Sequence, residues 1–166
     1  MSFPKIGLEL YTYRLEGTLA TPTDYHKVGV IRGERLNMQK SLVDVTSRLA
    51  NGFRLNKGGL IDGTIDCDAI YLPSNADLQA FETAFFNGTQ VLMAFVDGPL
   101  QDGDQEHGEP AGSTNVEGLW GAFNVTNFGQ ARGLEDATTI DIQFAATLEA
   151  STNTAPEWKV TAVTLT

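Results

Sequence analysis

Regular alternation of apolar and polar side chains over residues 60–71 restricts the fold of this chain more than any other feature. One face carries Ile61, Gly63, Ile65, Cys67, Ala69 and Tyr71, and the other carries Asp62, Thr64, Asp66 and Asp68. A period of two residues is typical of a β-strand with one buried and one solvated face. Antiparallel sheets have faces of this kind, whereas strands of parallel sheets are usually apolar on both sides.

Six further segments are predicted to be strands. Residues 138–148 alternate in the same way, with Ile140, Ile142 and Phe144 on one face. Residues 91–96 are an unbroken apolar run, which indicates a strand buried on both faces. The others are 6–13, 28–36, 119–128 and 158–165. The stretch 17–24 between the first two is rich in turn residues, and its Pro22 argues against a continuous strand there.

One helix is predicted among the strands, over residues 75–87. Ser74 is placed to cap its first turn, and Asp77 follows at the position of a capping box. Gly88 stands where a left-handed residue would end the helix. Its apolar residues at helical spacing are Leu78, Phe81 and Phe85. We therefore expect an amphipathic helix packed on a sheet.

The whole chain, residues 1–166, is predicted to be one mainly β domain. A length of 166 residues fits a single domain, and 17 glycines suit a fold with many turns. Seven or eight strands with one helix are best accounted for by an antiparallel β-sandwich or barrel with one flanking α-helix.

Residues 37–59 lose the alternation and are predicted to be a long loop. Loops of this length in compact domains are usually functional or disordered, and its apolar side chains argue against disorder. These are Met38, Leu42, Val43, Val45, Leu49, Phe53 and Leu55. A short helix over residues 42–49 is the alternative. Because a small β-domain has little surface on which to bury such a loop, we expect a neighbouring subunit to cover it.

The chain is acidic, with a formal net charge of −10 and a sequence pI of about 4.5. Residues 97–117 carry six carboxylates and neither lysine nor arginine, so they are predicted to be an exposed, mobile loop. An acidic surface repels phosphate, which disfavours specific nucleic-acid binding through basic patches.

No catalytic, metal or cofactor site is predicted. His26 and His107 lie far apart without other ligands at suitable spacing. Asp66 and Asp68 point the same way on one strand, but they lack an apolar pocket and a third group to orient them. Residues 97–104 lack the order of ligands in an EF-hand. The chain is therefore not expected to be an enzyme.

Other residues that often carry function are assigned to packing. Cys67, the single cysteine, lies on an apolar face and is expected to be a small buried side chain. Trp120 and Trp158 are expected in the core or in an interface. The start of the chain has no apolar leader, and no segment has enough apolar residues to span a membrane. We expect a protein made and folded in a cytoplasm.

The predicted elements follow one another in a characteristic order between residues 28 and 148. Residues 42–48 lie in the long loop; the strand from Leu60, the capped helix and the apolar strand follow; residues 119–125 and the strand from Thr138 come after the acidic loop. This order resembles the major tail proteins, or tail tube proteins, of long-tailed, non-contractile bacteriophages and related tail-like particles.

The resemblance implies a structural subunit that assembles into stacked hexameric rings. Inner strands of all subunits would form one barrel around a negatively lined channel, through which the genome passes into the host cell without specific binding. The implied partners are other copies and other tail proteins, namely the tape measure, terminator and distal tail proteins, with no membrane. The implied location is the virion tail, assembled in the host bacterial cytoplasm.

The resemblance also assigns residues to roles. The loop 37–59 would reach an adjacent subunit or ring, through Met38, Leu42, Asp44, Val45, Arg48, Phe53 and Leu55. The polar faces of the two alternating strands are the candidates for the channel wall: Asp62, Thr64, Asp66, Asp68, Thr139, Asp141 and Gln143. Closing a sheet across subunits would also remove exposed strand edges.

The main alternative from another class is a monomeric ligand- or carbohydrate-binding β-sandwich. It predicts a discrete monomer with exposed aromatic side chains beside a concave face. A small hydrolase ranks below it, because no nucleophile, base and orienting group can be nominated together.

Overall fold

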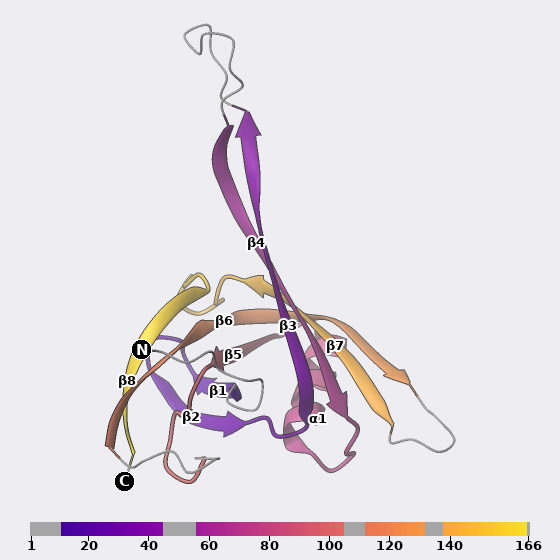
Figure 1. The fold of residues 1–166 in the computed structure, drawn as a ribbon. Coiled ribbons are helices and arrows are strands. Elements are labelled where there is room, and N and C mark those ends of the chain that lie inside the picture. Colours follow the sequence, from indigo (N-terminus) through magenta and orange to yellow (C-terminus); the bar gives the residue numbers. More distant parts are fainter. Residues whose placement is uncertain (1–10, 45–55, 105–111, 132–137, 166) are drawn as a thin grey trace, which may run out of the picture.

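The computed structural model describes residues 11–44, 56–104, 112–131 and 138–165. These residues form one antiparallel sheet and one helix (Figure 1). The elements are β1 (Tyr11–Gly17), β2 (Pro22–Lys27), β3 (Ile31–Asp44), β4 (Asn56–Ile70), α1 (Ala76–Asn87), β5 (Gln90–Val96), β6 (Gly112–Ala131), β7 (Thr139–Thr147) and β8 (Glu157–Leu165). The predicted mainly β, antiparallel fold with one flanking helix is confirmed.

The strands follow the order β2-β1-β5-β6-β7-β4-β3, and β8 also pairs with β6. The 20-residue strand β6 pairs with β5 along one edge, and with β8 and then β7 along the other. Gly118 lies where β5 and β8 flank β6 together, and a Cβ atom there would come within 2.0 Å of the Phe95 carbonyl oxygen. Only glycine allows this close approach.

Two apolar clusters lie on the two sides of β5. Val91, Met93 and Phe95 face one cluster, and Ala94 and Val96 face the other. The predicted burial of this strand on both faces is therefore confirmed. The first cluster is the larger, and it fills the space between α1 and the strands β4, β6 and β7.

The helix α1 covers the apolar side of the sheet. Its Phe81 ring lies 5.2 Å from the Phe144 ring of β7, centroid to centroid. Asn75, not Ser74 as predicted, caps the helix, because its side-chain oxygen accepts hydrogen bonds from the N–H groups of Asp77 and Leu78. Gly88 ends the helix with φ 64°, as predicted.

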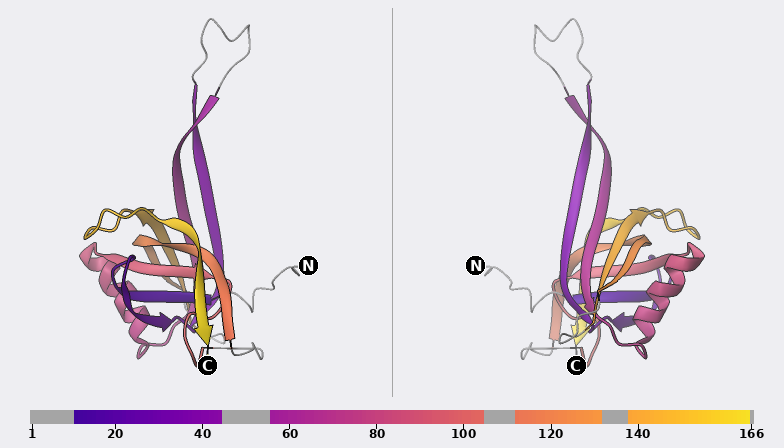
Figure 2. Two further views of the ribbon diagram at one scale, coloured as in Figure 1. Left: turned by 90° about the vertical axis from the view of Figure 1, so that its left-hand side faces the viewer. Right: turned by 90° about the vertical axis from the view of Figure 1, so that its right-hand side faces the viewer.

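The predicted loop over residues 37–59 is wrong for its two ends. Residues 37–44 belong to β3 and residues 56–59 to β4, and the two strands pair from Ile31 opposite Ala69 to Asp44 opposite Asn56. The alternative helix is excluded for residues 42–44, and residues 45–55 lie outside the described residues. Together β3 and β4 form a long antiparallel pair, and its outer part projects from the rest of the molecule (Figures 1 and 2).

Several other boundaries also differ from the prediction. A strand begins at Pro22, which β2 tolerates because it is an edge strand and Pro22 is its first residue. The expected exposed loop 97–117 is shorter, since residues 112–117 belong to β6 and residues 98–100 are buried. Of the expected first strand, residues 6–10 lie outside the described residues, and β1 continues to Gly17.

Candidate assembly surfaces

The seven residues predicted to line a channel lie on one face of the neighbouring strands β4 and β7: Asp62, Thr64, Asp66, Asp68, Thr139, Asp141 and Gln143. Asp66 is directly opposite Gln143, and Asp68 is directly opposite Asp141. Residues opposite one another point to the same side of a sheet. The pairing therefore brings two segments that are distant in sequence into one polar face.

A row of hydrogen bonds crosses this polar face from β3 to β6. Asn37 Nδ2 donates to Asp66 Oδ2 at 3.0 Å, and Gln143 Nε2 donates to Asp66 Oδ1 at 2.8 Å. The Thr126 hydroxyl donates to Gln143 Oε1 at 3.0 Å. The row ties four strands together on the solvent side, so the face is ordered as well as polar.

Asp68 and Asp141 form a like-charge pair across β4 and β7, and both are exposed. Two carboxylates that face each other directly on neighbouring strands repel and destabilise a sheet. A local conflict of this kind is typical of a surface shaped by function rather than by stability.

The other face of the same strands is apolar, and its burial changes along the strands. In the part of β4 that pairs with β7, Ile65, Cys67 and Ala69 are buried in the larger cluster. Further out, Leu36 is 38% exposed and Met38 is 49% exposed. Both belong to this face, because Leu36 is opposite Ile65 and Met38 is opposite Gly63.

We define the ribbon as residues 38–44 and 56–63, which pair only with each other among the described residues. Of the residues predicted to contact another subunit, Met38 and Asp44 are exposed on the ribbon, and Leu42 lies on it by its backbone. Val45, Arg48, Phe53 and Leu55 lie outside the described residues. The ribbon thus carries the exposed apolar side chain of Met38 away from the core of its own subunit.

The strands β6, β7, β4 and β3 have two unpaired outer edges in the described part of the chain. β3 is the last strand of the sheet. β6 pairs with β5 only as far as Asn124, so residues 125–129 have no strand partner on that side among the described residues. Unpaired backbone N–H and C=O groups of this kind are ready to pair with another strand.

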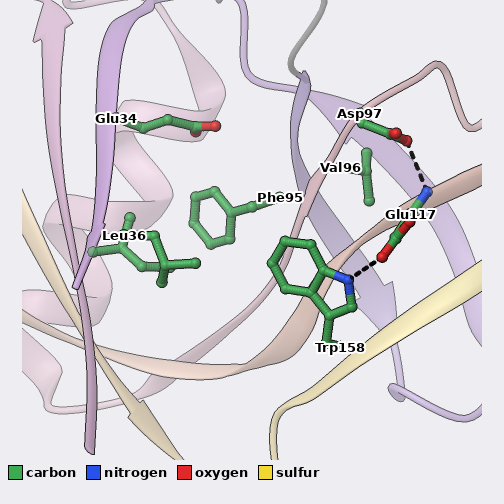
Figure 3. Close-up of a pocket in the computed structure, with 8 residues that line it drawn as sticks. Glu34, Leu36, Phe95, Val96, Asp97, Glu117 and Trp158 are labelled. Atoms are coloured by element: carbon green, nitrogen blue, oxygen red, sulfur yellow. Dashed lines mark hydrogen bonds between the residues drawn. The ribbon is translucent and has the colours of Figure 1, made fainter. Parts of the chain in front are cut away.

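A groove of about 450 Å³ opens between β3 and β8 (Figure 3). Its lining is mainly apolar: Leu36, Ile65, Phe95, Val96 and Trp158, with the carboxylates Glu34, Asp97 and Glu117. The Trp158 side chain is 57% exposed, and its indole N–H donates to Glu117 at 2.6 Å. Of the two tryptophans predicted to lie in the core or in an interface, Trp120 is in the core, and Trp158 is outside it.

The carboxylates of this groove already have partners within the subunit. Glu34 accepts a hydrogen bond from the Thr12 hydroxyl, and Asp97 accepts one from the Glu117 N–H. Burial raises the pKa of the Glu34 carboxyl, although the bond from Thr12 acts in the opposite direction. No sequence pattern indicates this groove, because its residues come from five separate strands and the turn after β5.

An aromatic patch lies where the end of α1 packs beside β6. It consists of Phe85, Phe86 and Phe128. The rings of Phe85 and Phe86 lie 5.4 Å apart, and those of Phe85 and Phe128 lie 6.4 Å apart. Phe86 is 74% exposed, and Phe85, which the helical spacing places with Leu78 and Phe81, is only partly buried.

Features that would suggest chemistry are sparse in the described residues. They contain no group of three or more His, Cys, Asp or Glu side chains able to hold a metal ion. Cys67 is buried as expected, and burial raises the pKa of its thiol. None of the helices within the described ranges is long and apolar enough to cross a membrane.

Comparison with known proteins gives a family and a fold. A family model described as phage tail tube protein matches residues 14–152. No curated protein matches the chain.

Several solved structures are similar in fold. A chain from the tail of an empty gene transfer agent particle, obtained with helical refinement and C6 symmetry, has a TM-score of 0.66 at 17% identity, over 94% of this chain and 99% of that one. The SPP1 tail tube protein has a TM-score of 0.63 at 15% identity, over 86% and 75%. A chain of the anti-feeding prophage baseplate has 0.54 at 9% identity, over 99% and 98%.

Proposed function

The chain belongs to the phage tail tube protein family, and from this premise we propose that its copies close into hexameric rings that stack head to tail around a channel for the genome. The chain is a structural protein of a tail and not an enzyme. The observation that carries the proposal is the pair of unpaired edges on a sheet with one polar and one apolar face.

The direction of the strands suits closure into a ring. β6, β7, β4 and β3 alternate in direction, because each pairs antiparallel with the next. After four strands, β3 of one copy runs opposite to β6 of the next, as an antiparallel ladder requires. A continuous barrel of this kind leaves no strand edge exposed. Six copies are favoured by the C6 symmetry of the gene transfer agent tail.

The polar face is the better candidate for the inside of the barrel. Its opposite face is covered by α1 and the larger apolar cluster, so only the polar face is free to meet water in a channel. Exposed carboxylates such as Asp62, Asp68 and Asp141 would repel DNA phosphates at close range, where a Debye length of about 8 Å gives little screening. DNA would pass without being bound.

The ribbon is the candidate for contact between rings. It projects beyond the body of the subunit (Figure 2), and the described residues leave its Met38 side chain 49% exposed. Contacts that join a ribbon to a different surface on the next copy are heterologous, and such contacts produce open stacks. Other tail proteins would meet the two ends of the stack, in the virion tail after assembly in the host cytoplasm.

Electron microscopy of the purified chain tests this proposal. We expect hollow tubes or stacked rings with six-fold end views. A single species of 17.9 kDa at all concentrations would contradict it and would favour the monomeric ligand-binding module. That module would use the groove beside Trp158.

A further inference from the structure

The groove between β3 and β8 and the aromatic patch beside β6 lie on the same side of one sheet, at its two opposite edges. The groove opens beside β3, the last strand of the sheet. The patch lies where α1 ends against the unpaired part of β6. We propose that the aromatic patch of one copy inserts into the groove of the next copy, with Phe86 as the side chain that enters. This inference rests on the proposed ring.

The pairing register places the two surfaces at the same level of the sheet. Phe128 of the patch is opposite Ile142, Ile142 is opposite Cys67, and Cys67 is opposite Glu34 of the groove. The next row runs in the same way from Val125 to Leu36. Rotation about the ring axis would therefore carry the patch towards the groove, and the strand tilt and stagger that barrel closure requires would set the register between β6 and β3 of the next copy.

Both surfaces also face the same side. The row from Phe128 to Glu34 belongs to the apolar face, since Ile142 and Cys67 within it are buried in the larger cluster. The helix that carries Phe85 and Phe86 packs on this face. When β3 of the next copy joins β6, its Leu36 would lie beside α1, and the groove would lie next to the end of that helix.

The shapes and polarity of the two surfaces match. The groove is a hollow of about 450 Å³ with an apolar lining, and Phe86 is a protruding aromatic ring that is 74% exposed. Glu34, Asp97 and Glu117 accept hydrogen bonds within their own subunit. Each carboxylate therefore keeps a hydrogen-bond donor when an apolar ring enters the groove. Aromatic side chains in well-packed pockets are the usual source of interface affinity.

Each copy would use one patch and one groove, which are different surfaces. Such contacts join copies head to tail and close when the rotation returns to the first copy. The contact would thus seal the outer layer of the ring while strand pairing joins the inner layer. It would also bury Trp158 and Leu36, two apolar side chains that the isolated subunit leaves half-exposed.

Cysteine cross-linking tests the proposal in the full-length chain. The native Cys67 is buried, so introduced cysteines react selectively. Tubes of the double variant Phe86→Cys/Leu36→Cys, treated with a short bismaleimide, should give a ladder of covalent oligomers that ends at the ring size. The matched control Phe86→Cys/Leu72→Cys should give no ladder, because Leu72 is exposed outside the groove. Tubes without a ladder would overturn the insertion and leave the tube itself intact.

Single substitutions and tryptophan fluorescence give a second measure. Phe86→Ala should raise the concentration needed for tube formation by roughly tenfold or more, whereas Leu72→Ala should leave it unchanged. Trp158 should be accessible to acrylamide in the monomer and shielded in tubes, with buried Trp120 as the internal reference.

Two outcomes would contradict the proposal. If Phe86→Ala assembles like the native chain, the patch is not in the contact. If Trp158 is shielded in the monomer and becomes accessible when residues 1–10 are removed, the chain's own N-terminal segment occupies the groove. A chain that forms no tubes under any condition would instead remove the proposed function, and this inference with it.

Discussion

Strands β3 and β4 have two different environments along their length. In the body of the subunit their apolar face is buried, and Ile65 is only 1% exposed. In the ribbon the same face continues, yet Met38 is half-exposed. One pair of strands therefore supplies both part of the core and a surface that the described residues leave exposed. We expect another copy of the chain to cover Met38, because an exposed apolar side chain that continues a buried face is a candidate for an interaction site.

The largest effect on the isolated subunit should come from the body. Phe144 is fully buried and contacts Phe81 of the helix. We expect Phe144→Ala to lower the free energy of unfolding by about 3–5 kcal/mol, through lost burial and the cavity left behind. Met38→Ala in the ribbon should change it by no more than about 0.5 kcal/mol. Urea unfolding of the monomer measures both, and equal losses would show that the ribbon packs on its own body.

A smaller effect is expected at the start of the helix that covers the body. Asn75 accepts two backbone hydrogen bonds there, whereas Ser74 accepts none in the described residues. Asn75→Ala should cost about 1 kcal/mol, and the matched Ser74→Ala should be nearly neutral. The same urea titrations decide between them. A larger loss at Ser74 would restore the capping box that the sequence predicts.

The free energy of unfolding should depend weakly on pH through Glu34. This residue lies on β3 opposite the buried Cys67, and burial raises the pKa of its carboxyl above the ordinary value of 4.5. The folded state then binds this proton more tightly than the unfolded chain does. Its contribution to stability is therefore complete below pH 4.5 and is lost as the pH rises through the raised pKa. Glu34→Gln should reduce this loss, measured by unfolding across a pH series. An unchanged pH dependence would exclude Glu34 as its source.

The smallest effect on stability should come from removing the ribbon. Replacing residues 38–63 by Asn-Gly leaves Asn37 and Thr64, which are opposite each other, joined by a tight hairpin turn. We expect a folded subunit whose unfolding free energy changes little, and that forms rings but no stacked tubes in electron micrographs. Normal tubes from this variant would show that the ribbon does not join the rings.

Much of the fold could be predicted because one residue pattern was strong. The alternation in β4 and β7 reflects a sheet with one wet and one dry face, so the polar face and its seven residues followed directly. The helix was predictable from its apolar spacing and from Gly88. Its N-cap was predicted one residue too early, because Ser74 and Asn75 are both suitable capping residues. The apolar residues of β4 and β7 in the larger cluster were placed correctly because their own subunit buries them.

The ribbon was missed because its strands lack the cue on which the prediction depended. Apolar residues alternate in β3 at Leu36 and Met38, but Lys40 breaks the series, and Gly58 and Gly59 weaken β4. The groove could not be foreseen either. Its residues meet only through long-range pairing, and Glu34, Phe95 and Trp158 have no common spacing in the sequence.

Methionine oxidation tests most directly whether another copy covers the apolar face of the ribbon. Met38 is half-exposed in the subunit, and Met93 is fully buried and serves as the internal reference. Brief treatment with peroxide, followed by peptide mass spectrometry, should oxidise Met38 in the monomer and spare it in tubes, with Met93 spared in both. Equal oxidation of Met38 in monomer and tube would contradict the account, and so would a Met38 already protected in the monomer.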